Sequence, residues 1–234
     1  MLGLVIFDCD GVLVDSELIS CRAHARVLTR HGYPITPDQV LERFLGVSDR
    51  EARQIVETEL GRKLPDDVEA EIKQETLRFY AGDLKAIAHV GEVMAAIDLL
   101  KCVASSGTPE KIHHGLSCAG LYEDFAPHIF SALQVNRGKP APDLFLFAAE
   151  QMKVAPERCL VIEDSVPGVT SARAAAMTVL GFHGASHCRD GYGATLKAAG
   201  ARKTFDDMRQ LPALIAQNEG SVAGFSAVQA ISGP

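Results

Sequence analysis

Short apolar runs recur along the chain and alternate with longer segments that have helical signatures. The first run, residues 2–7, contains β-branched side chains and ends at Asp8, which is typical of a buried parallel strand. Comparable runs predict four further strands, at residues 102–105, 128–131, 160–163 and 178–182. Adjacent segments predict helices at residues 91–100, 109–119, 142–152 and 167–176. This alternation predicts an α/β fold with a doubly wound, Rossmann-like parallel sheet.

One long segment breaks this alternation. Between residues 15 and about 83 no strand-like run occurs, and helix starts recur instead. Thr36 and Gln39 form one predicted capping box, residues 48–51 form a second, and Gly61 is placed to end the helix that follows. The sequence therefore predicts an inserted α-helical domain.

These patterns divide the chain into three predicted parts. Residues 1–15 and 83–219 form the catalytic core, and residues 16–82 form a helical cap inserted into it. Residues 220–234 are small, mostly apolar and uncharged, and the sequence leaves open whether they form a disordered tail or a packed arm.

The composition narrows the range of partners and compartments. A formal net charge of -7 argues against binding to nucleic acid or to an anionic membrane, because both need an excess of basic side chains. The six cysteines include no CxxC pair, and the N-terminal apolar run is too short and lacks the positive charge of a signal peptide. We therefore expect a cytoplasmic protein with reduced thiols, either a monomer or a homodimer.

Polar segments follow the ends of several predicted strands. Because ligands bind at the carboxyl ends of the strands in an open α/β sheet, we expect these segments to meet at one site. They are residues 8–15, 105–107, 139–143 and 163–168.

The first of these segments offers a nucleophile and a proton donor. Asp8 can attack phosphorus, and Asp10, two residues further on, can pass a proton to the leaving group. Gly11 lets the chain turn tightly and bring main-chain groups close to a bound phosphate. The two carboxylates repel each other, and a divalent cation bound between them would offset that repulsion.

The other segments supply the remaining groups that phosphoryl transfer needs. Glu163 and Asp164 add carboxylate oxygens of the kind that Mg²⁺ prefers, with Asp164 as the direct ligand. Ser105 and the amide of Ser106 would donate hydrogen bonds to phosphoryl oxygens, and Lys139 would hold nucleophile and phosphate together. The candidate ligand is a small phosphorylated metabolite.

Taken in order, four motifs resemble the haloacid dehalogenase-like (HAD) hydrolase superfamily. They are D-x-D-G-x-L-x-D-S at residues 8–16, V-A-S-S at 103–106, K-P-x-P-D at 139–143 and E-D-S-x-x-G at 163–168. The resemblance covers residues 2 to roughly 214, and the position of the insertion matches the subgroup with a helical cap. That subgroup includes β-phosphoglucomutase, phosphoglycolate phosphatase and 6-phosphogluconate phosphatase.

The resemblance implies a magnesium-dependent phosphatase that forms an aspartyl-phosphate on Asp8. It also implies that the main-chain carbonyl of Asp10, rather than its side chain, binds the metal. The first motif, residues 102–107 and the cap loop look most like the 6-phosphogluconate phosphatase branch. The expected substrate is therefore a phosphosugar or a sugar-acid phosphate.

Two other functions remain as alternatives. A sugar-phosphate mutase would carry a histidine near Ser20, where this chain has serine, and the arginine of the cap loop stands one position away, at Arg50. A phosphometabolite-binding regulator that has lost its chemistry is the alternative from another class, and the intact Asp8 and Asp10 argue against it. Dehalogenation is disfavoured because the dehalogenases of the superfamily lack the second aspartate.

Several residues also have purely structural interpretations. Ser16 is expected to cap the helix that follows it, with hydrogen bonding on the phosphate side as the alternative. His183 and His187 are expected to be ordinary loop histidines rather than zinc ligands, because nearby glycines argue against a helix that would align them. Arg50, Glu17 and Lys85 could select the substrate from the cap side, with Arg50 as a candidate for binding phosphate, or could simply be solvated.

Overall fold

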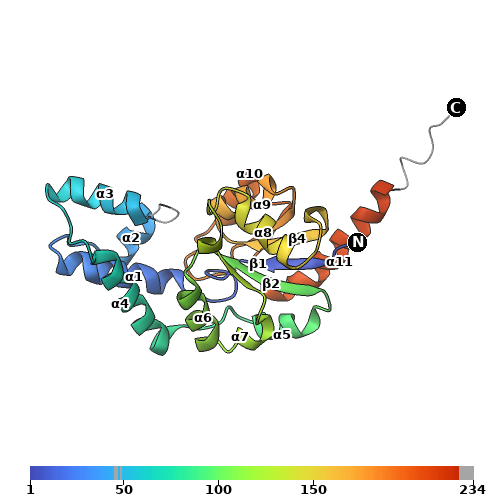
Figure 1. Cartoon of the computed structure of the whole chain (residues 1–234), viewed down its shortest axis with the longest axis horizontal. Coiled ribbons are helices and arrows are strands. Elements are labelled where there is room, and N and C mark those ends of the chain that lie inside the picture. Colours follow the sequence, from blue (N-terminus) through green and yellow to red (C-terminus); the bar gives the residue numbers. More distant parts are fainter. Residues whose placement is uncertain (45–46, 48, 227–234) are drawn as a thin grey trace.

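The computed structural model describes residues 1–44, 47 and 49–226, and it has a parallel sheet covered by helices on both faces (Figure 1). The strand order is β3-β2-β1-β4-β5-β6, and all neighbouring strands are parallel. The strands are β1 (Leu4–Phe7), β2 (Leu100–Ser105), β3 (Ile129–Ser131), β4 (Cys159–Glu163), β5 (Thr178–Phe182) and β6 (Lys203–Phe205). The predicted α/β fold with a doubly wound parallel sheet is confirmed.

Alternate strand residues face two separate hydrophobic clusters. In β1, Val5 and Phe7 face one cluster, and Leu4 and Ile6 face the other. The helices of the first cluster are α5 (Val90–Ala96), α6 (Pro109–Cys118), α7 (Tyr122–Phe125) and α11 (Leu211–Ser226). Those of the second are α8 (Asp143–Gln151), α9 (Val166–Ala174) and α10 (Tyr192–Ala199). β1 is fully buried between β2 and β4, so its carboxyl end lies near the middle of the sheet edge at which these parallel strands end.

Four helices with a hydrophobic cluster of their own occupy the left side of Figure 1. They are α1 (Glu17–Arg30), α2 (Pro37–Phe44), α3 (Asp49–Leu60) and α4 (Val68–Asp83). The predicted capping box at the start of α2 is present, since Thr36 and Gln39 exchange side-chain and main-chain hydrogen bonds of 2.9 and 3.2 Å. Gly61 follows the last residue of α3 with a positive φ of 65°, as expected of a helix stop. The second predicted capping box begins at Ser48, outside the described residues.

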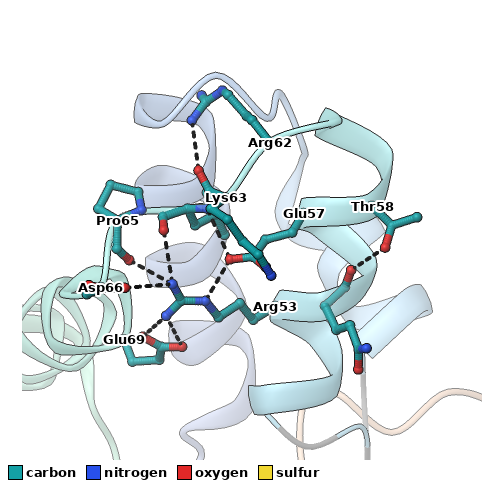
Figure 2. A network of polar contacts seen from close by, with 10 residues as sticks. Arg53, Glu57, Thr58, Arg62, Lys63, Pro65, Asp66 and Glu69 are labelled. Atoms are coloured by element: carbon teal, nitrogen blue, oxygen red, sulfur yellow. Dashed lines mark hydrogen bonds and ion pairs between the residues drawn. The ribbon is translucent and has the colours of Figure 1, made fainter.

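A single arginine joins α3 to α4 and to the chain between them (Figure 2). Arg53 donates to Glu57 at 2.9 Å and to both oxygens of Glu69 at 2.9 and 2.8 Å. Its other terminal nitrogen donates to the carbonyls of Leu64 and Pro65. A planar guanidinium can serve all these acceptors at once, which a lysine ammonium at the same place could not do.

The structure differs from the sequence-based expectations at several element ends. The helix predicted at residues 91–100 ends at Ala96, because β2 begins at Leu100. Strand β6 and helices α7, α10 and α11 were not predicted. β6 has only three residues and starts with an exposed lysine, so it lacks an apolar run. Helix α11 continues to Ser226, and the predicted boundary at residue 220 therefore falls within a helix.

Two further expectations concern the cysteines and the membrane. All six cysteines are free thiols, as their spacing predicted. Within the described part of the chain, none of the helices combines the length and apolar character that crossing a bilayer requires.

Candidate active site

Three acidic side chains meet where β1 and β4 end side by side. Asp8 follows β1, Glu163 is the last residue of β4, and Asp164 follows it. One carboxylate oxygen from each lies within 4.8 Å of the other two, and all three side chains are buried. Such a group of oxygens is suited to a hard divalent cation.

Lys139 connects two of these carboxylates. Its ammonium donates to Asp8 Oδ1 and to Glu163 Oε1, both at 2.6 Å, and it also lies 4.9 Å from the centre of the Phe145 ring. The side chain of Lys139 is only 4% exposed, so water screens these ion pairs weakly. Lys139 therefore holds Asp8 in one orientation next to Glu163.

Glu163 is fixed from its other side by the start of α9. Its Oε2 accepts from the main-chain N–H and the hydroxyl of Ser165, at 2.8 and 2.9 Å. The Ser165 hydroxyl in turn accepts from the N–H of Gly168 and caps α9. A Cβ atom on Gly168 would lie 1.8 Å from Glu163 Oε1, so only glycine leaves room for this carboxylate.

Asp164 lies against the turn that follows β1. Gly11 has a φ of +75°, and a Cβ atom there would lie 1.8 Å from Asp164 Oδ2. On its other side, Asp164 Oδ2 is 3.3 Å from His187 Nε2. Glycine at this position lets the Asp164 carboxylate approach the turn, whereas the role of Gly11 near phosphate stays a prediction.

Asp10 does not belong to the group formed by Asp8, Glu163 and Asp164. Its Oδ1 accepts from the Ser16 hydroxyl at 2.6 Å and the Tyr80 hydroxyl at 3.3 Å, and its Oδ2 accepts from Lys111 at 3.0 Å. Ser16 occupies the N-cap position of α1, but its side chain makes no capping hydrogen bond. The expectation that Ser16 serves as a helix cap is therefore wrong, because its hydroxyl is used by Asp10.

The end of β2 forms the opposite side of the site. The Ser105 hydroxyl accepts from the N–H of Gly107 at 3.0 Å, and Ser131 donates to the Gly107 carbonyl at 2.6 Å. Ser105 is buried and Ser106 is exposed, and both line the same cavity as the three acidic residues. The bend that Gly107 makes after β2 thus presents both serines to the cavity.

Burial and neighbouring charges shift the pKa values of the site's carboxylates. Burial raises the pKa of Asp8 to about 7, with the neighbouring Glu163 adding to the rise and Lys139 opposing it. Burial, together with the negative charge of Glu163, holds the pKa of Asp164 well above its usual range. Burial also acts to raise the pKa of Asp10, but the Lys111 charge and three hydrogen bonds outweigh it and leave that pKa below its usual value.

A cavity of about 1000 Å³ lies above these residues. One side is formed by the strand ends, and the other by residues of α1, α2, α3 and α4 such as His24, Phe44 and Lys73. Arg50 lies exposed on α3 and is not one of the lining residues within the described part of the chain. The sequence-based suggestion that Arg50 binds phosphate therefore gains no support from its position.

Several residues in or next to the site were not singled out from the sequence as functional. Lys111 could have been found, because the predicted helix start at Pro109 places it in the first turn next to Ser105. Tyr80 carries no local signal, since its contact with Asp10 depends on how α4 packs on the core. His187 was expected to be an ordinary loop histidine, but it is 4% exposed and faces Asp164.

The sequence and the fold are those of a known family. A family model described as haloacid dehalogenase-like hydrolase matches residues 2–176. The chain belongs to this family. It is 35% identical over 211 residues to the 6-phosphogluconate phosphatase of Escherichia coli K12, covering 90% of this chain and 93% of that protein. It is also 32% identical over 179 residues to a phosphorylated carbohydrates phosphatase of Thermotoga maritima, covering 74% and 81%.

A solved structure of this haloacid dehalogenase-like family has the same fold. It is a conserved protein of unknown function from Agrobacterium tumefaciens C58, with 38% identity, a TM-score of 0.84, and coverage of 94% of this chain and 100% of that chain. The expected family and the expected phosphatase activity are thus confirmed by the family model and the phosphatase relatives.

Proposed function

We propose that this phosphatase is magnesium-dependent and hydrolyses a phosphosugar or a sugar-acid phosphate through an aspartyl-phosphate on Asp8. The observation that carries the proposal is the position of Asp8. It lies within the group of three acidic side chains, is held by Lys139, and faces a cavity that can accommodate a sugar phosphate. Residues 16–82 would act as the cap that encloses the leaving group.

The residues present fit a magnesium ion. Asp8, Asp164 and the main-chain carbonyl of Asp10 would bind it, with Glu163 either as a further ligand or as the partner that orients Lys139. Burial is the main cause of the raised pKa values of Asp8 and Asp164, and the neighbouring carboxylate of Glu163 adds to it. A divalent cation bound among these carboxylates would offset their mutual repulsion. When bound, Mg²⁺ would neutralise charge on the phosphoryl oxygens and on the carboxylates around them.

The side chains of this site account for both chemical steps. Lys139, the Ser105 hydroxyl and the Ser106 amide orient the phosphoryl group against Asp8. An oxygen of Asp8 forms a bond to phosphorus as the bond to the leaving oxygen breaks, and Asp10 gives that oxygen a proton. Asp10 then takes a proton from water as the water attacks the aspartyl-phosphate, which releases inorganic phosphate and restores Asp8.

The relatives suggest the substrate class. The two relatives described above are named for 6-phosphogluconate and for phosphorylated carbohydrates. A leaving group of that size would occupy the part of the cavity lined by α1, α2, α3 and α4. We therefore propose 6-phosphogluconate as the first substrate to test.

The test is phosphate release from 6-phosphogluconate, hexose and pentose phosphates, phosphoglycolate and nucleotides, with Mg²⁺ and with a chelator. We expect release to concentrate on a sugar or sugar-acid phosphate, to stop on chelation, and to return when Mg²⁺ is added back. Asp8→Asn is expected to lower kcat by more than about 10³-fold. Asp98→Asn, at an exposed position outside the cavity lining, is the matched control and should leave kcat unchanged.

Other outcomes would contradict the proposal in distinct ways. Full activity of Asp8→Asn would rule out the aspartyl-phosphate. An isomeric sugar phosphate in place of inorganic phosphate would identify a mutase, and tight ligand binding without turnover would identify a regulator.

A further inference from the structure

The start of α6 directs a lysine into the active site. The Thr108 hydroxyl caps this helix by accepting from the main-chain N–H of Lys111 at 3.3 Å, and Pro109 occupies the first turn. Since this turn follows directly on the end of β2, the Lys111 side chain enters the cavity beside Ser105. Its ammonium ends 3.0 Å from Asp10 Oδ2.

Each oxygen of Asp10 has a separate set of donors. Oδ1 is bonded by Ser16 and Tyr80, which lie at the start of α1 and on α4. Among the described residues, Lys111 donates to Oδ2, and it comes from the core helix α6 rather than from the inserted helices. Lys111 therefore ties Asp10 to the same core that carries Asp8.

The ion pair between Lys111 and Asp10 is partly shielded from water, which strengthens the attraction between the two charges. The side chains of Lys111 and Asp10 are 26% and 18% exposed. The carboxylates of Asp8, Asp10, Glu163 and Asp164 would be balanced by Lys139, Lys111 and one divalent cation. Without Lys111, the site would hold one more negative charge than this set balances.

We propose that Lys111 is a positioning residue for the acid–base step: it holds the Asp10 carboxylate where it can exchange a proton with the leaving oxygen and then with water. The inference rests on the function proposed above. Lys111 touches Asp10 rather than the reacting phosphorus. It stabilises the carboxylate that remains after the leaving oxygen has taken its proton, and it fixes the orientation in which that carboxylate receives a proton from water.

A role in binding substrate is the main competing explanation, and kinetics separate the two. A lysine that binds the leaving group would raise KM when it is removed, with a smaller effect on kcat. A lysine that positions Asp10 would lower kcat and leave KM almost unchanged. The two explanations thus predict opposite patterns in the same measurement.

The experiment measures kcat and KM of the full chain with Mg²⁺, on the compound of the phosphomonoester panel that wild type hydrolyses fastest. The panel decides the proposed function, and the variants decide this inference. We expect Lys111→Met to lower kcat at least tenfold with less than a threefold change in KM. Lys111→Arg, which keeps the charge, should retain at least five times the kcat of Lys111→Met. Lys153→Met, at an exposed lysine outside the cavity lining, should match wild type.

A double-mutant cycle with Asp10→Asn provides the decisive readout, using radiolabelled phosphate release to follow slow turnover. If Lys111 acts through Asp10, Lys111→Met should lower kcat less than twofold in the Asp10→Asn background. Circular dichroism and thermal melting of each variant exclude misfolding as the cause of a loss. An equal loss in both backgrounds, a rise in KM with kcat intact, or full activity of Lys111→Met would each overturn the proposal.

Discussion

Replacing Gly168 by alanine should disturb the active site although Gly168 has no chemical role of its own. Gly168 is the third residue of α9, and an added Cβ atom would lie 1.8 Å from Oε1 and 1.9 Å from the carboxyl carbon of Glu163. Contacts under 3.0 Å are not tolerated, so the carboxylate would have to move by more than about 1 Å. That movement separates Glu163 from Lys139 and from Ser165, whose bonds to it are 2.6 to 2.9 Å long.

The size of the effect follows from the bonds that are lost. A buried hydrogen bond to a charged group contributes about 1.5–3 kcal/mol, so losing the Lys139 bond and one Ser165 bond costs about 3–6 kcal/mol. The better helix propensity of alanine offsets at most about 1 kcal/mol. The net loss of about 2–5 kcal/mol corresponds to a fall in Tm of about 4–20 °C for a chain of this length. Because Lys139 also holds Asp8, we expect kcat to fall by at least about tenfold.

Thermal melting and kcat of Gly168→Ala test this reasoning, and Gly91→Ala is the matched control. Gly91 is also in the first turn of a helix, but no atom of the described residues lies within 4 Å of the position its Cβ atom would take. The control should keep its kcat and gain up to about 1 kcal/mol in stability. A Gly168→Ala protein that melts within about 2 °C of wild type with unchanged kcat would refute the tight packing of Glu163 against α9.

Two further predictions concern the inserted helices and their contact with the core. Hydrogen bonds from Lys63 and Arg53 lower the pKa of Glu57 from 4.5 to about 2. Its contribution to stability is therefore complete above pH 4.5 and is lost as the pH falls toward 2. Glu57→Gln should lower Tm at pH 6, and its difference in Tm from wild type should shrink as the pH falls from 4.5 toward 2. A Tm difference that does not depend on pH would contradict the lowered pKa of Glu57. Tyr80→Phe removes the hydroxyl that donates to Asp10 and keeps the buried ring. The kcat should therefore fall roughly three- to tenfold, while Tm stays within about 2 °C of wild type. An unchanged kcat would count against a role for the bond from Tyr80 to Asp10.

The sequence was informative where a residue's role depends on its immediate neighbours. Asp8 and Glu163 could be placed together because each ends an apolar run, and parallel strands bring their carboxyl ends to one edge of the sheet. The start of α2 was predictable because Thr36 and Gln39 cap it with bonds between residues three apart. Strand β6 was missed because its three residues are stabilised by pairing with β5 rather than by an apolar pattern of their own.

The site could not be completed from the sequence where a contact joins distant segments. Ser16 looked like a helix cap because serine before a helix usually is one, and only the folded chain shows its hydroxyl on Asp10. Tyr80 is 70 residues from Asp10 in the sequence. Its contribution depends on the packing of α4 against the core, which no local pattern records.

The residues around the phosphoryl group and the residues that face the leaving group come from different parts of the chain. Asp8 and Asp164 follow strands of the core and Lys139 lies in the loop before α8, whereas the facing part of the cavity is lined by α1, α2, α3 and α4. Changes on those helices can therefore alter which leaving group is accepted without moving the groups around phosphorus. Asp10 is the exception, because its donor Ser16 is the N-cap residue of α1 and its donor Tyr80 lies on α4. A shift of α1 or α4 would therefore tend to move the Asp10 carboxylate and so affect proton transfer. The hydrogen bond from Lys111, which belongs to the core, would limit that movement.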